Sequence, residues 1–327
     1  MKKHYLKIIG FLILVYIFFK IDISSVVKIL AGARIGYIIA AVFLVLPTIL
    51  IKSWRWKYLL KMQGVNYSLK NAFSSYLLSS CLGALTPGRV GEFSKAFFLR
   101  GDEGVNIGKA FSSVLTDRFL DLIVLIIFSF VGVFYFSLAL DKIVFASLFF
   151  ILFILAMLVV FINKPLRNKL FHLINAWLPF KKYVKQPEIH FNNFFEELNA
   201  FKSRRILIPI IASFIASLVF YCSIYLIALS LRIQISYFSI MLCISIVNIV
   251  SLIPVSISGI GTRDATLVVL FPIIGLSKEN AIGFSLAILL IMHVCYAILG
   301  SIAWWRNPLK MEMISSLNMK VTDSEKT

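Results

Sequence analysis

Residues 82–100, LGALTPGRVGEFSKAFFLR, place a Pro-Gly break and a group of charged side chains inside an apolar chain. The preceding residues 71–88 carry no charge, and Arg89, Glu92 and Lys95 then follow within seven residues. Proline lacks a backbone N–H and glycine adopts unusual dihedral angles, so the apolar helix must end at this break. A second helix can start at Glu92. The stretch therefore predicts two helical segments joined by a turn.

The composition of the chain indicates an integral membrane protein. Its 327 residues are 60% hydrophobic and only 15% charged, whereas a soluble domain carries about 25% charged residues. The formal net charge is +18, but the basic residues lie between apolar runs and do not form one face or tail. This pattern fits the positive-inside rule and not nucleic-acid binding. Anionic lipid headgroups are the expected counter-charge.

The apolar segments predict an all-α, polytopic membrane bundle that forms one domain over residues 1–310. Six segments approach the roughly 20 residues that cross a bilayer: 7–20, 35–51, 119–138, 143–162, 206–230 and 280–304. Two further apolar regions, 72–100 and 237–276, are interrupted by Pro and Gly. These two regions are predicted to be re-entrant helical hairpins.

The distribution of Lys and Arg predicts the orientation. If each hairpin enters and leaves on one side, one face holds 26 of the 33 Lys and Arg residues. The opposite face holds the other seven: Lys20, Lys28, Arg34, Lys142, Arg232, Arg263 and Lys278. This asymmetry predicts a multi-pass protein of the plasma (inner) membrane with both termini in the cytoplasm. The hairpins then enter from opposite sides, which is typical of an inverted-topology repeat.

The hydrophilic segments predict no separate catalytic domain. Residues 163–205 are expected to form a basic cytoplasmic loop with an amphipathic helix, which either packs on the bundle or lies on an anionic leaflet. Residues 311–327 are expected to be a disordered cytoplasmic tail. The four cysteines have no C-x-x-C spacing, so no metal site is expected. The chain has no Walker A, H-E-x-x-H or G-x-S-x-G motif, so no cofactor and no ATP-driven pump are expected.

The first hairpin turn carries the elements of an anion site. Its predicted turn residues are Thr86, Pro87, Gly88 and Gly91. A new helix start offers free backbone N–H groups at the positive end of the helix dipole, and Arg89 adds a bidentate donor suited to phosphate. Glu92 could pair with Arg89 or with Lys95. In the alternative interpretation, the break only kinks a span and the arginine extends to the interface.

The second hairpin turn has the same layout. The helix is expected to end at Pro254, and Thr262 is expected to be the N-cap of the next helix. Asp264 in its first turn would complement the helix dipole, and Arg263 is again a lone guanidinium in an apolar region. The predicted turn residues are Pro254, Ser258, Gly259 and Gly261.

A third charged cluster, Thr116–Asp121, is predicted at the start of the third span. Asp117 and Asp121 are four residues apart and share a helix face, and Arg118 is adjacent to that face. The cluster is either an ordinary interfacial group or a set of counter-charges that faces the cavity between the hairpins.

Three motifs in this order, LTPGRVGEFSKAFFLR (85–100), SSVLTDRFLDL (112–122) and SGIGTRDATLVVLF (258–271), resemble the lysylphosphatidylglycerol synthase transmembrane-region family, also called flippase-like domain proteins. The resemblance runs from about residue 10 to 305. It implies a bacterial or archaeal inner-membrane protein that handles anionic or aminoacylated lipids. In relatives, this region moves a modified phosphatidylglycerol between leaflets, and a separate cytosolic domain attaches the amino acid. This chain is expected to be the translocating half.

The resemblance implies a lipid translocase that is not itself an enzyme. The alternatives are a membrane-embedded lipid or polyprenyl-phosphate transferase, with Asp117, Asp121 or Glu92 as general base, and a non-catalytic partner of a separate synthase. The Ser258–Gly261 turn departs slightly from the family pattern. The predicted headgroup-binding residues are Arg89, Glu92, Lys95, Asp117, Arg118, Asp121, Thr262, Arg263 and Asp264.

Overall fold

The computed structural model describes residues 28–137, 204–252 and 259–306, and the secondary structure in these ranges is entirely helical. Four described helices are long and apolar enough to cross a membrane: α3 (Ile35–Met62), α6 (Ile107–Ser137), α10 (Leu207–Ser230), which follows the short turn η4 (Arg204–Ile206), and α13 (Lys278–Arg306). Shorter helices lie between them: α4 (Leu69–Leu85), η1 (Pro87–Phe93), α5 (Ser94–Glu103), α11 (Tyr237–Ser251) and α12 (Thr262–Ile273). The predicted all-α, multi-pass membrane fold is confirmed.

Two spans extend beyond their predicted bounds. Helix α3 continues to Met62, past the expected end at residue 51, and α6 begins at Ile107, well before residue 119. The predicted bounds are too short because charged residues in these extensions, Arg55 and Asp117, pair with each other inside the bundle and do not end the helices. The predicted spans 7–20 and 143–162, nearly all of the loop 163–205 and the tail 311–327 lie outside the described residues.

Thr86 sets the geometry of the first hairpin turn. Its backbone is extended, with φ −112° and ψ 143°, as expected for a residue that precedes proline. Its hydroxyl donates to the Leu82 carbonyl at 3.1 Å and accepts from the Gly91 N–H at 2.7 Å. Directly after Thr86, residues 87–93 form the three-ten helix η1. The α-helix that follows therefore starts at Ser94 and not at Glu92, which corrects the predicted start.

Glycine at position 91 lets η1 lie directly against the end of α4. A Cβ atom at Gly91 would overlap the carbonyl group of Leu82 and would lie 2.8 Å from the Gly83 nitrogen. Both neighbours are backbone atoms, which a side-chain rotation cannot move aside. The backbone of the turn thus specifies glycine by contact and not by an unusual dihedral angle.

The second hairpin turn resembles the first in outline. Helix α11 ends at Ser251, and α12 begins after Gly261, whose φ is +88°. Gly261 occupies the N-cap position that was predicted for Thr262, because the Asp264 carboxylate accepts the Gly261 N–H at 2.8 Å. Gly259 also has a positive φ, +75°. The predicted turn residues Pro254 and Ser258 lie outside the described residues.

The two halves of the described chain repeat one order of elements: a long helix, a short helix, a break, a short helix and a long helix. The connections after α3 and α10 match in detail. Val65 and Ile233 each donate the backbone N–H to the carbonyl five residues earlier, at 2.9 and 3.1 Å, which is a helix-ending pattern of the Schellman type. Ser68 and Ser236 then cap α4 and α11 with their side chains.

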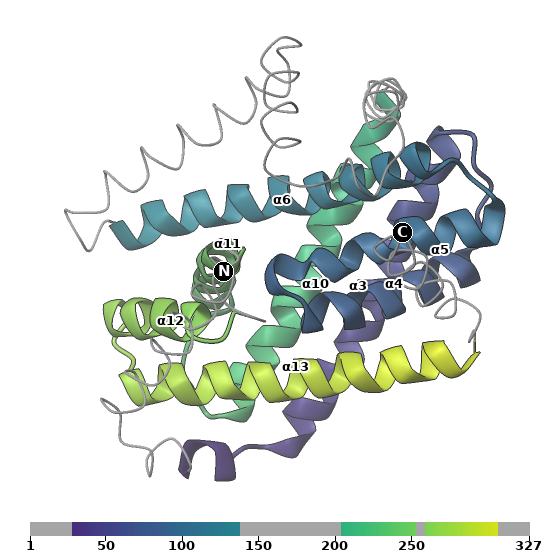
Figure 1. Cartoon of the computed structure of the whole chain (residues 1–327). Coiled ribbons are helices and arrows are strands. Elements are labelled where there is room, and N and C mark those ends of the chain that lie inside the picture. Colours follow the sequence, from purple (N-terminus) through teal and green to yellow (C-terminus); the bar gives the residue numbers. More distant parts are fainter. Residues whose placement is uncertain (1–27, 138–203, 253–258, 307–327) are drawn as a thin grey trace, which may run out of the picture.

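The first helix of each hairpin packs on the last long helix of the other half. Helix α3 packs on α10, whereas α4 packs on α13 and α11 packs on α6. In Figure 1, α6 and α13 cross the view in opposite directions, with the α4–α5 hairpin on the right and the α11–α12 hairpin on the left. The hairpins therefore extend from opposite ends of the bundle. Their re-entrant course through a bilayer and the inverted-topology repeat stay predictions.

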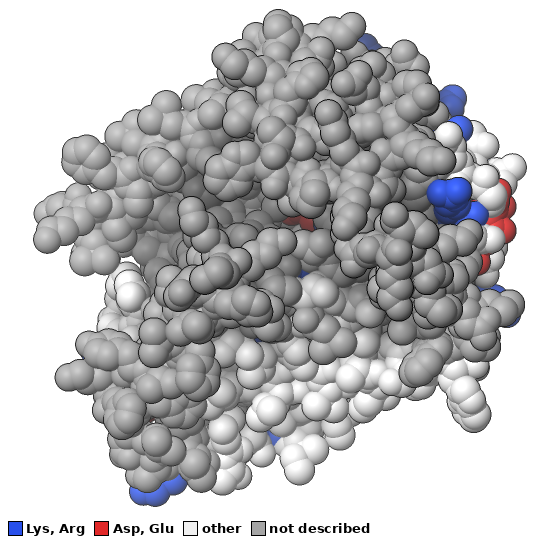
Figure 2. Space-filling view, in the orientation of Figure 1, with Lys and Arg blue, Asp and Glu red and all other residues white. Residues whose placement is uncertain are grey.

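The long helices expose apolar side chains along their outer faces. Phe43, Ile211 and Leu290 expose 68%, 57% and 57% of their surface. In Figure 2, most of the visible Lys, Arg, Asp and Glu surface lies at the right edge and the lower left corner, and only small charged spots appear between them. A largely uncharged band between charged ends is what a bilayer requires of a spanning bundle.

We expect Gly91→Ala to destabilise the protein by about 1–3 kcal/mol, the usual cost of forcing extra atoms into a packed position. Gly36→Ala is the matched control, since a Cβ at this exposed position of α3 meets nothing within 4 Å. Thermal melting in detergent, followed by size-exclusion chromatography, measures both variants. A Gly91→Ala protein that melts with the Gly36→Ala control would contradict the packing described for η1.

Candidate functional site

A buried arginine joins three of the long helices. Arg55 on α3 has no exposed surface, and its guanidinium reaches two carboxylates of α6. Nη2 lies 2.6 Å from Asp117 Oδ1, and Nη1 lies 2.6 Å from Asp121 Oδ1. Nη1 also donates to the Ser213 hydroxyl of α10 at 2.7 Å. Asp117 and Asp121 thus share a helix face, as predicted, and this face binds Arg55.

Lys95 of α5 is buried beside the same carboxylate. Its Nζ lies 2.6 Å from Asp117 Oδ2 and sits over two aromatic rings, 3.9 Å from the centre of Tyr76 and 5.3 Å from the centre of Trp56. The Tyr76 hydroxyl donates to Asp117 at 3.0 Å. A cation over an aromatic face gains electrostatic attraction when water is excluded. Asp117 therefore anchors the first hairpin to α6, and Lys95 does not pair with Glu92.

The cluster is held together by mutual charge compensation. Lys52 of α3 completes it, with Nζ 3.0 Å from Asp121 Oδ2. We call Lys52, Arg55, Lys95, Asp117 and Asp121 the charge cluster. Removing one partner of a buried ion pair leaves an uncompensated charge and costs about 3–5 kcal/mol. The cluster therefore fixes α3, α5 and α6 relative to one another.

Outside the spanning helices, the connection before α4 is fixed to the end of α5. The Tyr67 hydroxyl donates to Asp102 Oδ2 at 2.5 Å and shares a hydrogen bond with Ser75 at 2.9 Å. Burial raises the pKa of Tyr67, and the hydrogen bond to the Asp102 carboxylate raises it further. The hydroxyl therefore stays protonated and keeps donating at physiological pH.

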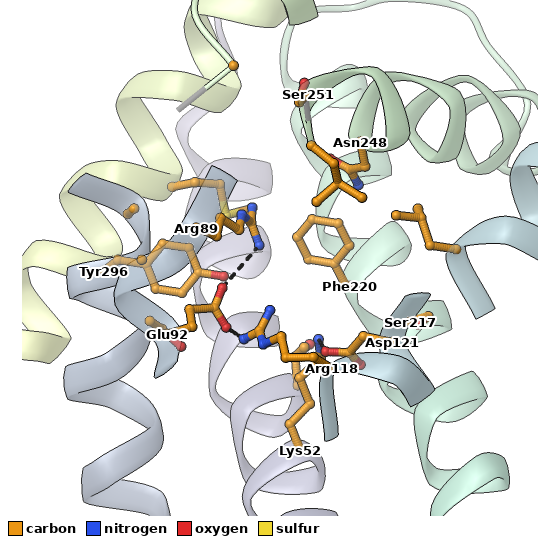
Figure 3. Close-up of a pocket in the computed structure, with 18 of the residues that line it drawn as sticks. Lys52, Arg89, Glu92, Arg118, Asp121, Ser217, Phe220, Asn248, Ser251 and Tyr296 are labelled. Carbon is orange, nitrogen blue, oxygen red and sulfur yellow. Dashed lines mark hydrogen bonds and ion pairs between the residues drawn. The ribbon is translucent and has the colours of Figure 1, made fainter. Parts of the chain in front are cut away.

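A cavity of about 470 Å³ lies between the two halves. Its walls come from α3, α4, η1 and α6 of the first half and from α10, α11 and α13 of the second, together with Gly259 and Arg263 (Figure 3). The volume falls within the range of about 300–1,000 Å³ that is usual for small-molecule sites. Neither half would form this cavity alone.

Glu92 joins the two arginines of the first half. Its carboxylate contacts the Arg118 guanidinium of α6 and lies 3.7 Å from Arg89 Nη1. Figure 3 shows the Glu92 side chain between the other two. Arg89 has φ +56°, an uncommon conformation for a residue other than glycine, and 56% of its side chain is exposed. The predicted Arg89–Glu92 pair is therefore present, with Arg118 as a second partner of the carboxylate.

Arg263 is the charged residue that the second half contributes to the cavity wall. Its Nε donates to the Ser285 hydroxyl of α13 at 2.6 Å, and Ser285 in turn contacts the Asp264 carboxylate. Arg263 Nη2 lies 3.7 Å from Asp264 Oδ1. Arg263 is thus positioned by two side chains, neither of which lines the cavity.

Two guanidinium nitrogens on the cavity wall have no hydrogen-bond partner among the described residues: Arg118 Nε and Arg263 Nη2. Arg263 is only 7% exposed. A buried donor without an acceptor costs about 1–3 kcal/mol, so both nitrogens would gain from binding an acceptor. The two donors come from opposite halves of the described chain.

The cavity wall carries a net positive charge. Among the described lining residues are four cations and two carboxylates, which gives a formal charge of +2: Lys52, Arg89, Arg118 and Arg263 against Glu92 and Asp121. A cleft with one sign of charge and low-dielectric walls concentrates ligands of the opposite sign. Within the described residues, no group of three His, Cys, Asp or Glu side chains could hold a metal ion.

The structure divides the predicted headgroup-binding residues into two sets. Five line the cavity: Arg89, Glu92, Arg118, Asp121 and Arg263. The other four do not line it, namely Lys95, Asp117, Thr262 and Asp264. Lys95 and Asp117 belong to the charge cluster, and Asp264 caps α12 and supports Arg263. Two predicted turn residues, Thr86 and Gly259, also line the cavity.

Sequence reasoning missed Lys52, Arg55 and Tyr76. Lys52 and Arg55 were placed on the cytoplasmic face because the second predicted span, 35–51, ended directly before them. A usable signal existed, since the two cations are three residues apart and therefore share a helix face. Tyr76 gave no signal, because an aromatic residue in an apolar run is ordinary. Its role depends on contacts that are distant in sequence.

The fold and the site together define a polytopic helical membrane protein with a charged cavity between two halves. Residues 7–300 match the family described as lysylphosphatidylglycerol synthase TM region, and the chain belongs to this family. The predicted resemblance is thus confirmed.

Two relatives are similar over nearly their whole lengths. A UPF0104 membrane protein of Methanocaldococcus jannaschii is 27% identical over 320 residues, which cover 92% of this chain and 94% of the relative. A UPF0104 membrane protein of Pyrococcus horikoshii is 26% identical over 329 residues, which cover 94% of this chain and 98% of the relative.

We expect Asp117→Asn to lower the free energy of unfolding by about 3–5 kcal/mol, because Arg55 and Lys95 would lose a shared buried counter-charge. Glu103→Gln, at the exposed end of α5, is the control for the same loss of one negative charge. Folded yield and thermal melting in detergent measure the difference. If Asp117→Asn melts like the control but loses lipid binding, Asp117 acts on the ligand and not on the fold.

Proposed function

We propose that the chain is a membrane lipid translocase, which moves an anionic or aminoacylated phospholipid between the leaflets of the plasma membrane. The lipid headgroup occupies the cavity between the two halves, and the acyl chains stay in the bilayer along the apolar outer faces of the helices. Family membership supports a membrane protein of this kind. The class of lipid rests on the chemistry of the cavity.

One observation carries the proposal: a cavity of net charge +2 is lined by arginines from both halves, Arg118 and Arg263, each with one guanidinium nitrogen that has no hydrogen-bond partner among the described residues. Guanidinium groups form strong, charge-assisted hydrogen bonds with phosphate oxygens. A phosphate between Arg118 Nε and Arg263 Nη2 would supply the acceptors that both donors lack. It would also neutralise part of the positive charge. A phosphate-bearing headgroup therefore fits this wall better than a neutral or cationic ligand.

The carboxylates of the cavity wall would also allow a headgroup that carries an amino group beside its phosphate. Asp121 and Glu92 line the same cavity as the arginines, so an amino group attached to the headgroup would find a counter-charge beside the phosphate. An aminoacylated lipid carries both groups. The sequence has no nucleotide-binding motif, so we propose downhill movement or coupling to an ion gradient.

The cellular setting follows from the charge distribution of the sequence. Both termini are proposed to lie in the cytoplasm, where a separate synthase or transferase could deliver a modified lipid to the translocase. In this proposal the chain itself catalyses no bond formation. The transferase alternative would instead place Glu92 or Asp121 at the reacting group.

Translocation by proteoliposomes tests the proposal. Purified protein is reconstituted with fluorescent phosphatidylglycerol, and the accessibility of the probe to a membrane-impermeant quencher is followed over time. We expect Arg89→Gln and Arg263→Gln to slow translocation at least about tenfold, because a hydrogen bond to a charged group is worth about 1.5–3 kcal/mol. Arg100→Gln, on an exposed residue of α5, is the matched control and should match wild type.

The outcomes separate the alternatives, provided that each variant elutes and melts as a folded protein. Equal rates in wild type, Arg89→Gln and Arg263→Gln would contradict a headgroup site in the cavity. Mass spectrometry of the lipids after incubation with candidate donor molecules examines the transferase alternative. A new lipid species formed by the purified chain would favour an enzyme over a translocase.

A further inference from the structure

Glu92 occupies the position that an anionic ligand of the cavity would take. Its carboxylate contacts the Arg118 guanidinium and lies 3.7 Å from Arg89 Nη1. The residue is 5% exposed, and it lines the cavity together with both arginines. Figure 3 shows the carboxylate between the two guanidinium groups. Two of the four cations on the cavity wall are therefore already bound to an anion that the chain itself supplies.

The backbone around Glu92 is built to leave room for this carboxylate. A Cβ atom at Gly83 of α4 would overlap Glu92 Cγ and would lie 3.2 Å from its Oε1. The Thr86 hydroxyl accepts the Gly91 N–H, which fixes the residue directly before Glu92. A carboxylate that enters the cavity by this route is a specific feature of the hairpin turn and not a surface side chain that happens to lie nearby.

Glu92 lies on a short helix of less regular geometry than its neighbours. The helix η1 spans only Pro87–Phe93 and is a three-ten helix, a type with poorer hydrogen-bond geometry than an α-helix. Within it, Arg89 has a left-handed φ of +56°, and such residues cluster at ligand clamps and switch regions. Lys95 and Asp117 of the charge cluster, by contrast, pair with each other and do not line the cavity.

The electrostatics favour exchange over simultaneous binding. With Glu92 in place, the described charges of the wall sum to +2; with its carboxylate withdrawn they would sum to +3. A phosphate that approaches Arg118 and Arg89 meets Glu92 as a like charge, and like charges at close range repel. Ligand and carboxylate therefore compete for the same guanidinium groups.

We propose that Glu92 is the exchangeable internal anion of the cavity: a phosphate group displaces its carboxylate from Arg118 and Arg89 on binding, and the carboxylate returns when the phosphate leaves. This inference rests on the proposed function. The ligand chemistry is a phosphate ester, carried by a lipid headgroup or by a free sugar or glycerol phosphate. Because the carboxylate is on η1, the exchange takes place at the first hairpin turn.

Glu92→Gln tests the exchange, because the amide keeps the shape of the side chain and removes the competing charge. Binding of phosphatidylglycerol, phosphatidylcholine and glycerol phosphate to the purified full chain is measured by native mass spectrometry. We expect Glu92→Gln to bind phosphatidylglycerol about tenfold more tightly than wild type, as when the ligand-competent state rises from about a tenth to nearly all of the population. Glu103→Gln, an exposed residue with the same change of charge, should match wild type.

A second variant keeps the proposal testable if Glu92→Gln does not fold. Glu92→Asp keeps the charge but shortens the reach to the arginines by one methylene, so we expect an affinity between those of wild type and Glu92→Gln.

Comparing glycerol phosphate with phosphatidylglycerol shows whether the phosphate alone or the whole lipid is recognised. Tighter binding of both ligands by Glu92→Gln supports the exchange with phosphate alone as the recognised group. Tighter binding of the lipid alone supports the exchange with the acyl chains as part of the ligand.

Of three further results, the first and the third would overturn one or both proposals. If wild type prefers phosphatidylglycerol and folded Glu92→Gln binds it equally or more weakly, the exchange is wrong and the proposed function stands. If only Glu92→Gln prefers phosphatidylglycerol over phosphatidylcholine, the exchange stands and native Glu92 blocks the site. If neither protein prefers the anionic lipid, both proposals are wrong.

Discussion

The ion pairs of Arg55 with Asp117 and Asp121 are the constraint on which the described structure depends. They join α3 to α6 inside the bundle, and the bond to Ser213 adds α10. Lys95 then attaches the first hairpin to the same carboxylate. Buried charges are costly unless each is paired and hydrogen-bonded, so this cluster permits few alternative arrangements of these helices. The hairpin turn, and with it η1, is held at the cavity by this arrangement.

The cavity differs from the charge cluster in how its charges are satisfied. Behind the wall, Asp117 accepts hydrogen bonds from Arg55, Lys95 and Tyr76. On the wall, Arg118 and Arg263 keep donors without partners among the described residues. The chain thus places the well-paired carboxylate Asp117 behind the wall and incompletely paired arginines on it. The first gives rigidity, and the second leaves binding energy for a ligand, which is the division of roles expected at a preorganised site.

Part of this arrangement could be predicted from the sequence and part could not. The break at Pro87, the Arg89–Glu92 pair and the shared face of Asp117 and Asp121 follow from local spacing, and the structure contains all three features. The partner of Lys95 could not be predicted, because Asp117 is 22 residues away in sequence and only the packing of α5 on α6 brings them together. The prediction that the span ends at residue 51 was wrong for a related reason. Its charges find partners inside the bundle, so they do not mark the end of a span.

The most direct test of the account is the lipid that the protein retains when it leaves a membrane. Native mass spectrometry of wild type released from mixed anionic and zwitterionic vesicles is compared with the Arg118→Gln/Arg263→Gln double variant and with Arg100→Gln. The account predicts that wild type and Arg100→Gln keep one anionic phospholipid that the double variant loses. Retention of the same lipid by the double variant, or equal retention of zwitterionic lipid by wild type, would contradict a phosphate site between the two halves.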